Sequence, residues 1–132
     1  MSNDILRRCV AEFIGTFALV FAGTGAIMIN EISGGSITPV GIGLTFGLIV
    51  SVMIFSLGHV SGAHINPAVT LAFVLSREFP ASNLLFYWLA QILGAITASL
   101  VLLNLIGDIA QLGATVPSGS VTQSLVLEFI LS

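Results

Sequence analysis

The sequence predicts an all-α membrane protein with three spanning helices, one re-entrant half-helix and the start of a fourth span. The 132-residue chain is 56% hydrophobic and only 7% charged, whereas a typical soluble domain is about 25% charged. Its mean hydropathy is +1.12, and its apolar residues gather in three runs that are each long enough to cross a bilayer. With only three Lys and Arg residues, the chain has no basic patch for nucleic acid.

The first predicted span covers about residues 6–29, and a crossing needs about 20 residues. Arg7 and Arg8 ahead of an apolar run are also typical of a signal peptide, but the apolar part of a signal peptide has about 7–15 residues. Glu12 lies inside the run, and a carboxylate at membrane depth is costly unless other groups satisfy it. We therefore expect a retained span.

The second predicted span covers about residues 37–57. Gly43 and Gly47 share one face of this helix, so we expect that face to approach another helix closely. Residues 58–65 hold two glycines, two histidines and a serine, which is not typical of a helix interior. We therefore expect the helix to end near residue 57.

A re-entrant loop and a half-helix are predicted over residues 58–76. Asn66 is a favoured N-cap residue, and Pro67 is favoured at the first helical position. A helix from there to about Leu75 is about 15 Å long, half of a hydrocarbon core of about 30 Å. It is expected to begin near the bilayer centre and to return to the side from which the chain entered.

The third predicted span covers about residues 83–106, with Tyr87 and Trp88 as expected anchors at the membrane surface. A loop rich in Gly, Pro and Ser follows. The last apolar stretch, residues 121–132, is too short to cross the bilayer. It is predicted to begin a fourth span.

The cations predict the orientation of the chain. Three spans and one returning loop place Arg7, Arg8 and Arg77 on one side of the membrane. The positive-inside rule makes that side cytoplasmic, so we expect a cytoplasmic N-terminus, with Glu31 and Asp108 outside. The predicted location is the lipid bilayer of the plasma (inner) membrane, with the chain as a multi-pass protein.

The chain also contains an internal repeat. The segment VAEFIGT near the N-terminus resembles VLEFILS at the C-terminal end, and Glu12 and Glu128 occupy the same place in the two copies. Because three spans separate the copies, the second copy would enter the membrane from the opposite side, as in inverted-repeat transporters. Residues 1–120 are therefore predicted to form a first repeat, and residues 121–132 an incomplete second one.

One segment carries most of the functional information. Residues 58–70, GHVSGAHINPAVT, closely resemble the first signature loop of the major intrinsic protein family, the aquaporins and glycerol facilitators. Further matches follow in order along the chain: AEF-x-GT in the first span, FGL in the second, AQ-x-x-GA in the third and EF in the fourth. The resemblance implies the N-terminal half of the aquaporin fold.

The residues of this loop have properties that suit a pore. A half-helix that begins at mid-bilayer points its unpaired N–H groups and its positive end at the membrane centre, and the Asn66 amide can donate hydrogen bonds to a passing oxygen. The resemblance implies that Asn66, Pro67 and Ala68 are the pore motif. It also implies that the loop offers acceptor carbonyls, which belong to Gly62, Ala63, His64 and Ile65.

Two glutamates and one aromatic residue have further implied roles. The resemblance implies that Glu12 and Glu128 each bind the backbone N–H groups of a re-entrant loop; a proton relay is the alternative. It also places Phe46, twenty residues before Asn66, at an outer constriction. Phenylalanine there resembles the water-selective members, whereas glycerol facilitators typically carry Trp. The alternative is that Phe46 packs with Phe55 in the core.

The predicted function is passive, cofactor-free permeation of water, and the alternative is a facilitator of glycerol or other small neutral solutes. No enzyme is predicted, because no set of nucleophile and base is present. His59 and His64, five residues apart, do not match a His-Glu-x-x-His metal site, so no metal is expected. The family is typically tetrameric. A second, missing repeat is expected to complete the pore, so a non-conducting truncated product is a further alternative.

Overall fold

The structure is a computed structural model that describes residues 3–117 and 119–131. These residues form helices joined by turns and loops, and they contain no strand. The elements, in chain order, are α1 (Asn3–Ile32), α2 (Thr38–Ser61), α3 (Pro67–Leu75), the 3₁₀ turn η1 (Ala81–Asn83), α4 (Leu84–Ile106), the single turn α5 (Ala110–Gly113) and α6 (Val121–Leu131).

Three helical segments are long and apolar enough to span a membrane. They contain 29, 24 and 26 residues and have mean hydropathies of 1.7, 2.3 and 2.1. At a rise of 1.5 Å per residue even the shortest is about 36 Å long, more than the hydrocarbon core of about 30 Å. The predicted all-α membrane fold with three spans is confirmed.

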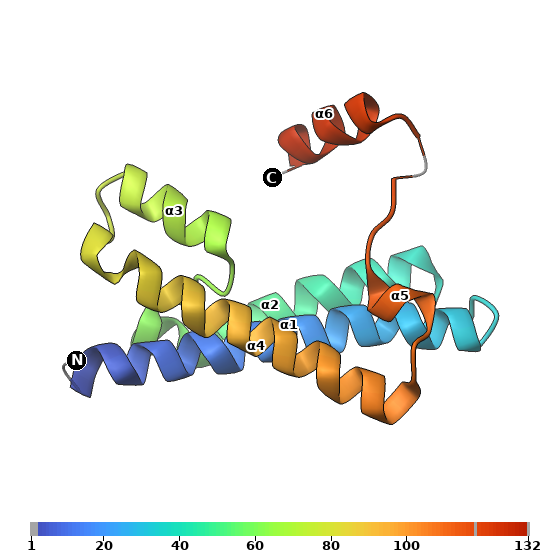
Figure 1. Ribbon diagram of the computed structural model, residues 1–132, viewed down its shortest axis with the longest axis horizontal. Helices are drawn as coiled ribbons and strands as arrows, with labels where there is room; N and C mark the ends of the chain where they lie inside the picture. The colour runs from blue at the N-terminus through green and yellow to red at the C-terminus, as the bar shows by residue number, and fades with distance from the viewer. Residues whose placement is uncertain (1–2, 118, 132) are drawn as a thin grey trace.

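Helix α1 lies between α2 and α4 (Figure 1) and packs against both. Its contact with α4 is close because small residues recur every four positions along α4: Ala90, Gly94 and Ala98 are all buried. A Cβ atom at Gly94 would lie only 2.5 Å from the carbonyl oxygen of Phe13. The two backbones therefore touch at a position that only glycine allows, as small residues permit between membrane helices.

Helix α2 does not end near residue 57, as the sequence predicted, but at Ser61. Gly58 and His59 remain helical, and the chain leaves the helix at Gly62, which has a φ of 92°. The Gly62 N–H donates to the Gly58 carbonyl at 2.9 Å, an ending in which glycine takes the left-handed conformation. Of the two glycines in this segment, Gly62 therefore ends the helix, whereas Gly58 is tolerated inside it.

The predicted close helix contact of Gly43 and Gly47 is not made among the described residues. Both glycines are exposed, and a Cβ atom added to either would meet nothing within 4 Å. Helix α2 packs on α1 through a different face, the one that carries Phe46. The small-residue face of α2 is thus open on this chain.

Helix α3 is re-entrant. Figure 1 shows it starting beside the first half of α4, where Trp88 contacts Pro67, and running back toward the end of the bundle where α1 begins. Its nine residues extend about 14 Å. Helix α6 is set apart from the bundle in the same view, and most of its side chains are exposed.

Candidate functional site

Glu12 is the centre of a buried hydrogen-bond network. Its side chain is fully buried, and its two carboxylate oxygens accept four hydrogen bonds from three other parts of the chain. The donors are the Ser61 hydroxyl (2.6 Å), the His64 N–H (2.9 Å), the Ile65 N–H (2.6 Å) and the Gln91 amide (2.8 Å). The cost of burying a carboxylate is offset by these bonds, and they tie the loop after α2 to α1 and α4.

These bonds determine where the loop carbonyls point. The C=O and N–H of one trans peptide unit point in opposite directions, and the described residues contain no cis peptide bond. Because the N–H groups of His64 and Ile65 point at Glu12, the carbonyls of Ala63 and His64 point away from it. The Ala63 N–H donates to the Ser61 hydroxyl at 3.0 Å, so the Gly62 carbonyl also points outward.

None of the carbonyl oxygens of residues 62–65 accepts a hydrogen bond from the part of the chain that the structure describes. These four oxygens therefore remain without a hydrogen-bond donor from the described residues. The Ile65 carbonyl completes the predicted set of four, although the orientation argument applies only to the first three.

The loop achieves this orientation through unusual backbone angles. Gly62, Ala63 and Ile65 all have positive φ, at 92°, 47° and 43°. For a residue with a Cβ atom the left-handed region costs about 1–2 kcal/mol, and for β-branched Ile65 it is a genuine outlier. The bonds to Glu12 hold this strained segment in place. Its sequence gave no signal for positive φ, since only Gly62 is a residue that favours it.

Asn66 ends the loop and caps α3. Its side-chain oxygen accepts the Ala68 N–H at 2.8 Å, and Pro67 occupies the first turn. Because the oxygen is engaged in capping, the NH₂ group is the free end of the amide, and it makes no hydrogen bond with the described residues. Asn66 is exposed, so its two N–H bonds are available as donors directly after the carbonyls of the loop.

The backbone of His64 is part of the loop, and its ring lies among aromatic side chains. The ring stacks on Phe73 with a centroid distance of 4.7 Å and lies edge-on to Phe79 at 4.9 Å. Its Nδ1 lies 3.2 Å from the Thr70 hydroxyl, which also accepts from Gln91 and has one proton to donate. With that proton on the Asn66 carbonyl at 3.1 Å, the proton on the ring is at Nδ1. His59 is exposed and does not lie among these side chains.

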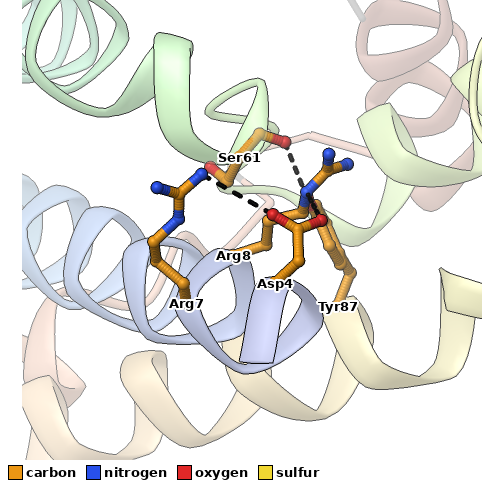
Figure 2. Close-up of polar contacts among 5 residues, drawn as sticks. All are labelled: Asp4, Arg7, Arg8, Ser61 and Tyr87. Atoms are coloured by element: carbon orange, nitrogen blue, oxygen red, sulfur yellow. Dashed lines mark hydrogen bonds and ion pairs between the residues drawn. The ribbon is translucent and has the colours of Figure 1, made fainter. Parts of the chain in front are cut away.

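Tyr87 and Trp88 are not the surface anchors that the sequence predicted. Tyr87 is fully buried, and Figure 2 shows its hydroxyl donating to the Ser61 carbonyl, at 2.7 Å. The Trp88 indole donates to the Pro67 carbonyl at 3.0 Å. Both lie on the inward side of α4, because the loop and α3 pack there and offer acceptors that a helix end at the membrane surface would not.

The N-terminal charges lie next to this region, as Figure 2 also shows. Arg8 pairs with Asp4 at 2.9 Å, and Arg7 lies 3.6 Å from the same carboxylate. The Arg7–Asp4 pair is exposed, whereas the Arg8 side chain is about two-thirds covered, with 37% of it exposed; exposed pairs contribute little to stability. Arg7 and Arg8, two of the three cations in the chain, therefore lie at the first turns of α1. Helix α3 returns toward the same end of the bundle.

Phe46 lies far from Asn66 and close to α1. Fifteen residues of helix separate Phe46 from Ser61, a distance of about 22 Å. The side chain is half-buried, and a Cβ atom at Gly23 would come within 2.1–2.6 Å of three atoms of its ring. The ring is therefore packed directly on the α1 backbone, whereas Phe55 on the same helix is 87% exposed.

Glu128 is not brought to the site. It lies on α6 and is exposed, and it makes no contact with the loop that Glu12 holds. The residues that sequence reasoning missed are those that support the loop from other elements: Ser61, Thr70, Tyr87, Trp88 and Gln91. Gln91, a polar residue within an apolar span, was the one available signal.

Comparison with known proteins identifies what the chain is similar to. The family model described as "Major intrinsic protein" matches residues 1–132. The chain is 45% identical to the aquaporin NIP3-1 of Arabidopsis thaliana, over 98% of this chain and 43% of that protein. It is 46% identical to the aquaporin NIP1-3 of Oryza sativa subsp. japonica, over 99% of this chain and 46% of that protein. It is 42% identical to nodulin-26 of Glycine max, over 100% of this chain and 49% of that protein.

Proposed function

The chain belongs to the major intrinsic protein family, and from this membership we propose that it forms the first half of a passive membrane channel for water. It spans less than half the length of the curated relatives it matches. The three apolar helices make it an integral membrane protein.

One observation carries the proposal: a row of outward carbonyl acceptors is followed directly by a free amide donor. The carbonyls of Gly62, Ala63 and His64 point away from Glu12, and the Asn66 NH₂ group follows them. A neutral molecule that both donates and accepts hydrogen bonds can exchange partners along such a row. Alternating groups of this kind replace the hydration that a molecule loses in a narrow pore.

The position of α3 supplies the discrimination against cations. The N-terminus of a helix carries a partial positive charge of about half an elementary charge, and Asn66 is the N-cap of α3. A cation or a proton that reached this point would be repelled, whereas a water oxygen would be attracted. The electrostatics therefore favour neutral solutes.

Water is favoured over larger neutral solutes by Phe46. Its half-buried ring on the α1–α2 contact is bulky, and at an outer constriction it would narrow the passage. Glycerol and other small neutral solutes are the second candidate, because they present the same hydroxyl chemistry to the carbonyl row. The choice depends on the other side of the constriction, which a second repeat would supply.

The remaining features of the proposal concern the assembly. A second repeat, entered at Glu128, would provide an opposed half-helix and its own loop. We place the N-terminus and Arg77 in the cytoplasm because Figure 1 puts the N-terminus and the returning end of α3 at the same end of the bundle. A homotetramer in the plasma membrane, acting without a cofactor or a catalytic step, completes the proposal.

The test uses a polypeptide in which residues 1–120 are joined to the second half of nodulin-26. Stopped-flow shrinkage of proteoliposomes should show water flux well above that of lipid alone. Asn66→Leu, which removes the donor, should lower that flux at equal protein content. Flux at the lipid level, or flux unaffected by Asn66→Leu, would reject the proposal. Parallel swelling in glycerol decides between the two solute classes.

A further inference from the structure

Two hydrogen bonds join α4 to α3, and their donors and their acceptors are equally spaced along the two helices. The Trp88 indole donates to the Pro67 carbonyl at 3.0 Å, and the Gln91 amide donates to the Thr70 hydroxyl at 2.9 Å. The donors are three residues apart on α4 and the acceptors three apart on α3. Residues at this spacing lie on one face of a helix, so the two bonds form a pair that sets the position of α3 along α4.

Helix α4 is the element that can fix α3. Among the described residues it is the one spanning helix that packs extensively on α3. The Gln91 bond belongs to the network around Glu12. The Trp88 bond reaches the first residue of α3, directly beside Asn66. Pro67 has no N–H of its own, so its carbonyl is the one backbone group through which this residue can be tied.

Breaking the hydrogen bond of Trp88 would leave its indole N–H without a partner. Indole is a donor only, and an indole N–H without a partner is costly where no water replaces the bond. The side chain is half-buried, and its N–H is bonded to the first residue of α3. This hydrogen bond therefore resists movement of the first turn of α3.

We propose that Trp88 is a positioning residue that sets where the Asn66 amide stands along the channel. This inference rests on the proposed function. A hydrogen bond weakens steeply once its geometry departs from about 3 Å and a straight angle. A small drift of the first turn of α3 would therefore move the Asn66 donors out of line with the loop carbonyls. The Gln91 bond, one turn further on, would still hold the body of α3.

The contact can be tested on the 132-residue chain because Trp88 is its one tryptophan. In lipid nanodiscs or bilayers, the chain is labelled with indole-¹⁵N tryptophan and carbonyl-¹³C proline. Solid-state dipolar dephasing should report a ¹⁵N–¹³C separation of about 4 Å, the sum of the hydrogen bond and part of the C=O bond. Pro67→Ala removes the labelled carbonyl at that position and should abolish the dephasing. Its absence in the unsubstituted chain would overturn the proposal.

The positioning role is tested in the channel completed with the second half of nodulin-26. Trp88→Phe keeps a ring and removes the donor. A water molecule that loses one hydrogen bond to displaced Asn66 donors meets a barrier higher by about 1 kcal/mol, which corresponds to roughly a fivefold fall in water flux per folded channel. The activation energy of permeation should rise with it. Phe86→Leu, a change of an exposed neighbour on α4, should leave both unchanged.

The outcomes separate the two ideas. A purely structural role for Trp88 predicts less folded channel but unchanged flux and activation energy per channel, and that result would overturn the positioning role. If Trp88→Phe folds poorly, benzothienylalanine at position 88 replaces the N–H with sulfur at nearly the same shape and gives the same comparison. If the unsubstituted channel shows no flux while the dephasing is present, the proposed function fails and the Trp88 contact stands.

Discussion

At the scale of single residues, the site depends on one carboxylate that bonds groups from three elements. Glu12 accepts from the loop backbone, from Ser61 at the end of α2 and from Gln91 on α4. A group in this position stabilises the loop by accepting from the backbone N–H groups of His64 and Ile65, which make no other hydrogen bond with the described residues. The proton-relay alternative would require Glu12 to exchange hydrogen-bond partners during transport, whereas each of its two oxygens already accepts from two donors of the fold.

We expect Glu12→Leu to reduce the yield of folded protein and to lower its thermal denaturation midpoint in detergent. The change leaves the N–H groups of His64 and Ile65 buried without an acceptor, and each costs about 1–3 kcal/mol. Glu31→Leu removes an exposed carboxylate and is the matched control, with little change expected. A normal midpoint with a shifted pH dependence of flux in the completed channel would instead support the relay.

The two functions of the Asn66 side chain can be separated by Asn66→Asp. Aspartate keeps an oxygen that can accept the Ala68 N–H, so α3 should remain capped. The two donors are lost, and a negative charge is placed where the helix end is positive. In the completed channel we expect lower water flux together with a cation leak, measured as sodium uptake into proteoliposomes. Sodium exclusion equal to that of the unsubstituted channel would contradict the electrostatic argument.

At the scale of the elements, α1 and α4 form the tight pair and α2 is the helix with the open face. The difference lies in the glycines. Gly94 is in contact with the backbone of α1, whereas Gly43 and Gly47 have open space around them. Identical spacing of small residues therefore has different consequences in the two helices, and the spacing alone does not say which face has a partner.

This difference predicts opposite effects of the same substitution. Gly94→Ala should destabilise the 132-residue chain, because its methyl group would lie 2.5 Å from the Phe13 carbonyl oxygen and the helices would have to separate. Gly43→Ala should be neutral or stabilising by about 0.5–1 kcal/mol, since alanine is the better helix former. Both changes add one methyl group. The denaturation midpoints of the two variants in detergent provide the comparison, and equal midpoints would contradict the packing.

The sequence predicted the elements better than their partners. Spans and the start of α3 follow from local properties: apolar length, and the pairing of Asn66 with Pro67. The predicted end of α2 near residue 57 is four residues too early. Composition alone does not show that Gly58 stays helical and that the helix ends at Gly62. The roles of Tyr87 and Trp88 were not predictable, since their acceptors lie 26 and 21 residues away in the chain and only the folded bundle brings them together.

At the scale of the whole molecule, polar groups concentrate where α3 enters and apolar side chains cover the rest. Helix α2 has no buried residue within its most apolar window, and α6 is exposed along nearly its whole length. Lipid, a second repeat and neighbouring subunits are the surfaces that such faces suit. The described residues thus form a supported loop on an otherwise lipid-compatible bundle.

Membrane orientation is tested by cysteine labelling in a Cys9→Ala background. Position 31 is in the last turn of α1 and position 76 lies beside Arg77 at the end of α3, and both are exposed, so the two variants are Glu31→Cys and Ser76→Cys. An impermeant maleimide should label position 31 from outside the cell and position 76 only after permeabilisation. Labelling of both positions from the same side would refute the predicted topology.

The 132-residue chain alone should not conduct water. Its half-helix of nine residues extends about 14 Å and covers about half of a hydrocarbon core of about 30 Å. Two copies could supply both halves only if one inserted upside down, which the positions of Arg7, Arg8 and Arg77 oppose. Proteoliposomes holding the purified chain should shrink at the rate of plain lipid. Faster shrinkage that Asn66→Leu abolishes would show that the chain assembles a pore by itself.

The seat of Phe46 on Gly23 has a consequence for how relatives of this chain can diverge. Three atoms of the ring occupy the space that a Cβ atom at position 23 would need, so the two positions share one volume. A relative with a side chain at position 23 therefore needs a smaller residue at position 46. Conversely, a relative with a large aromatic residue at position 46 needs glycine at position 23. We therefore expect these two positions to covary across the family, with a change of transported solute accompanying each exchange of size between them.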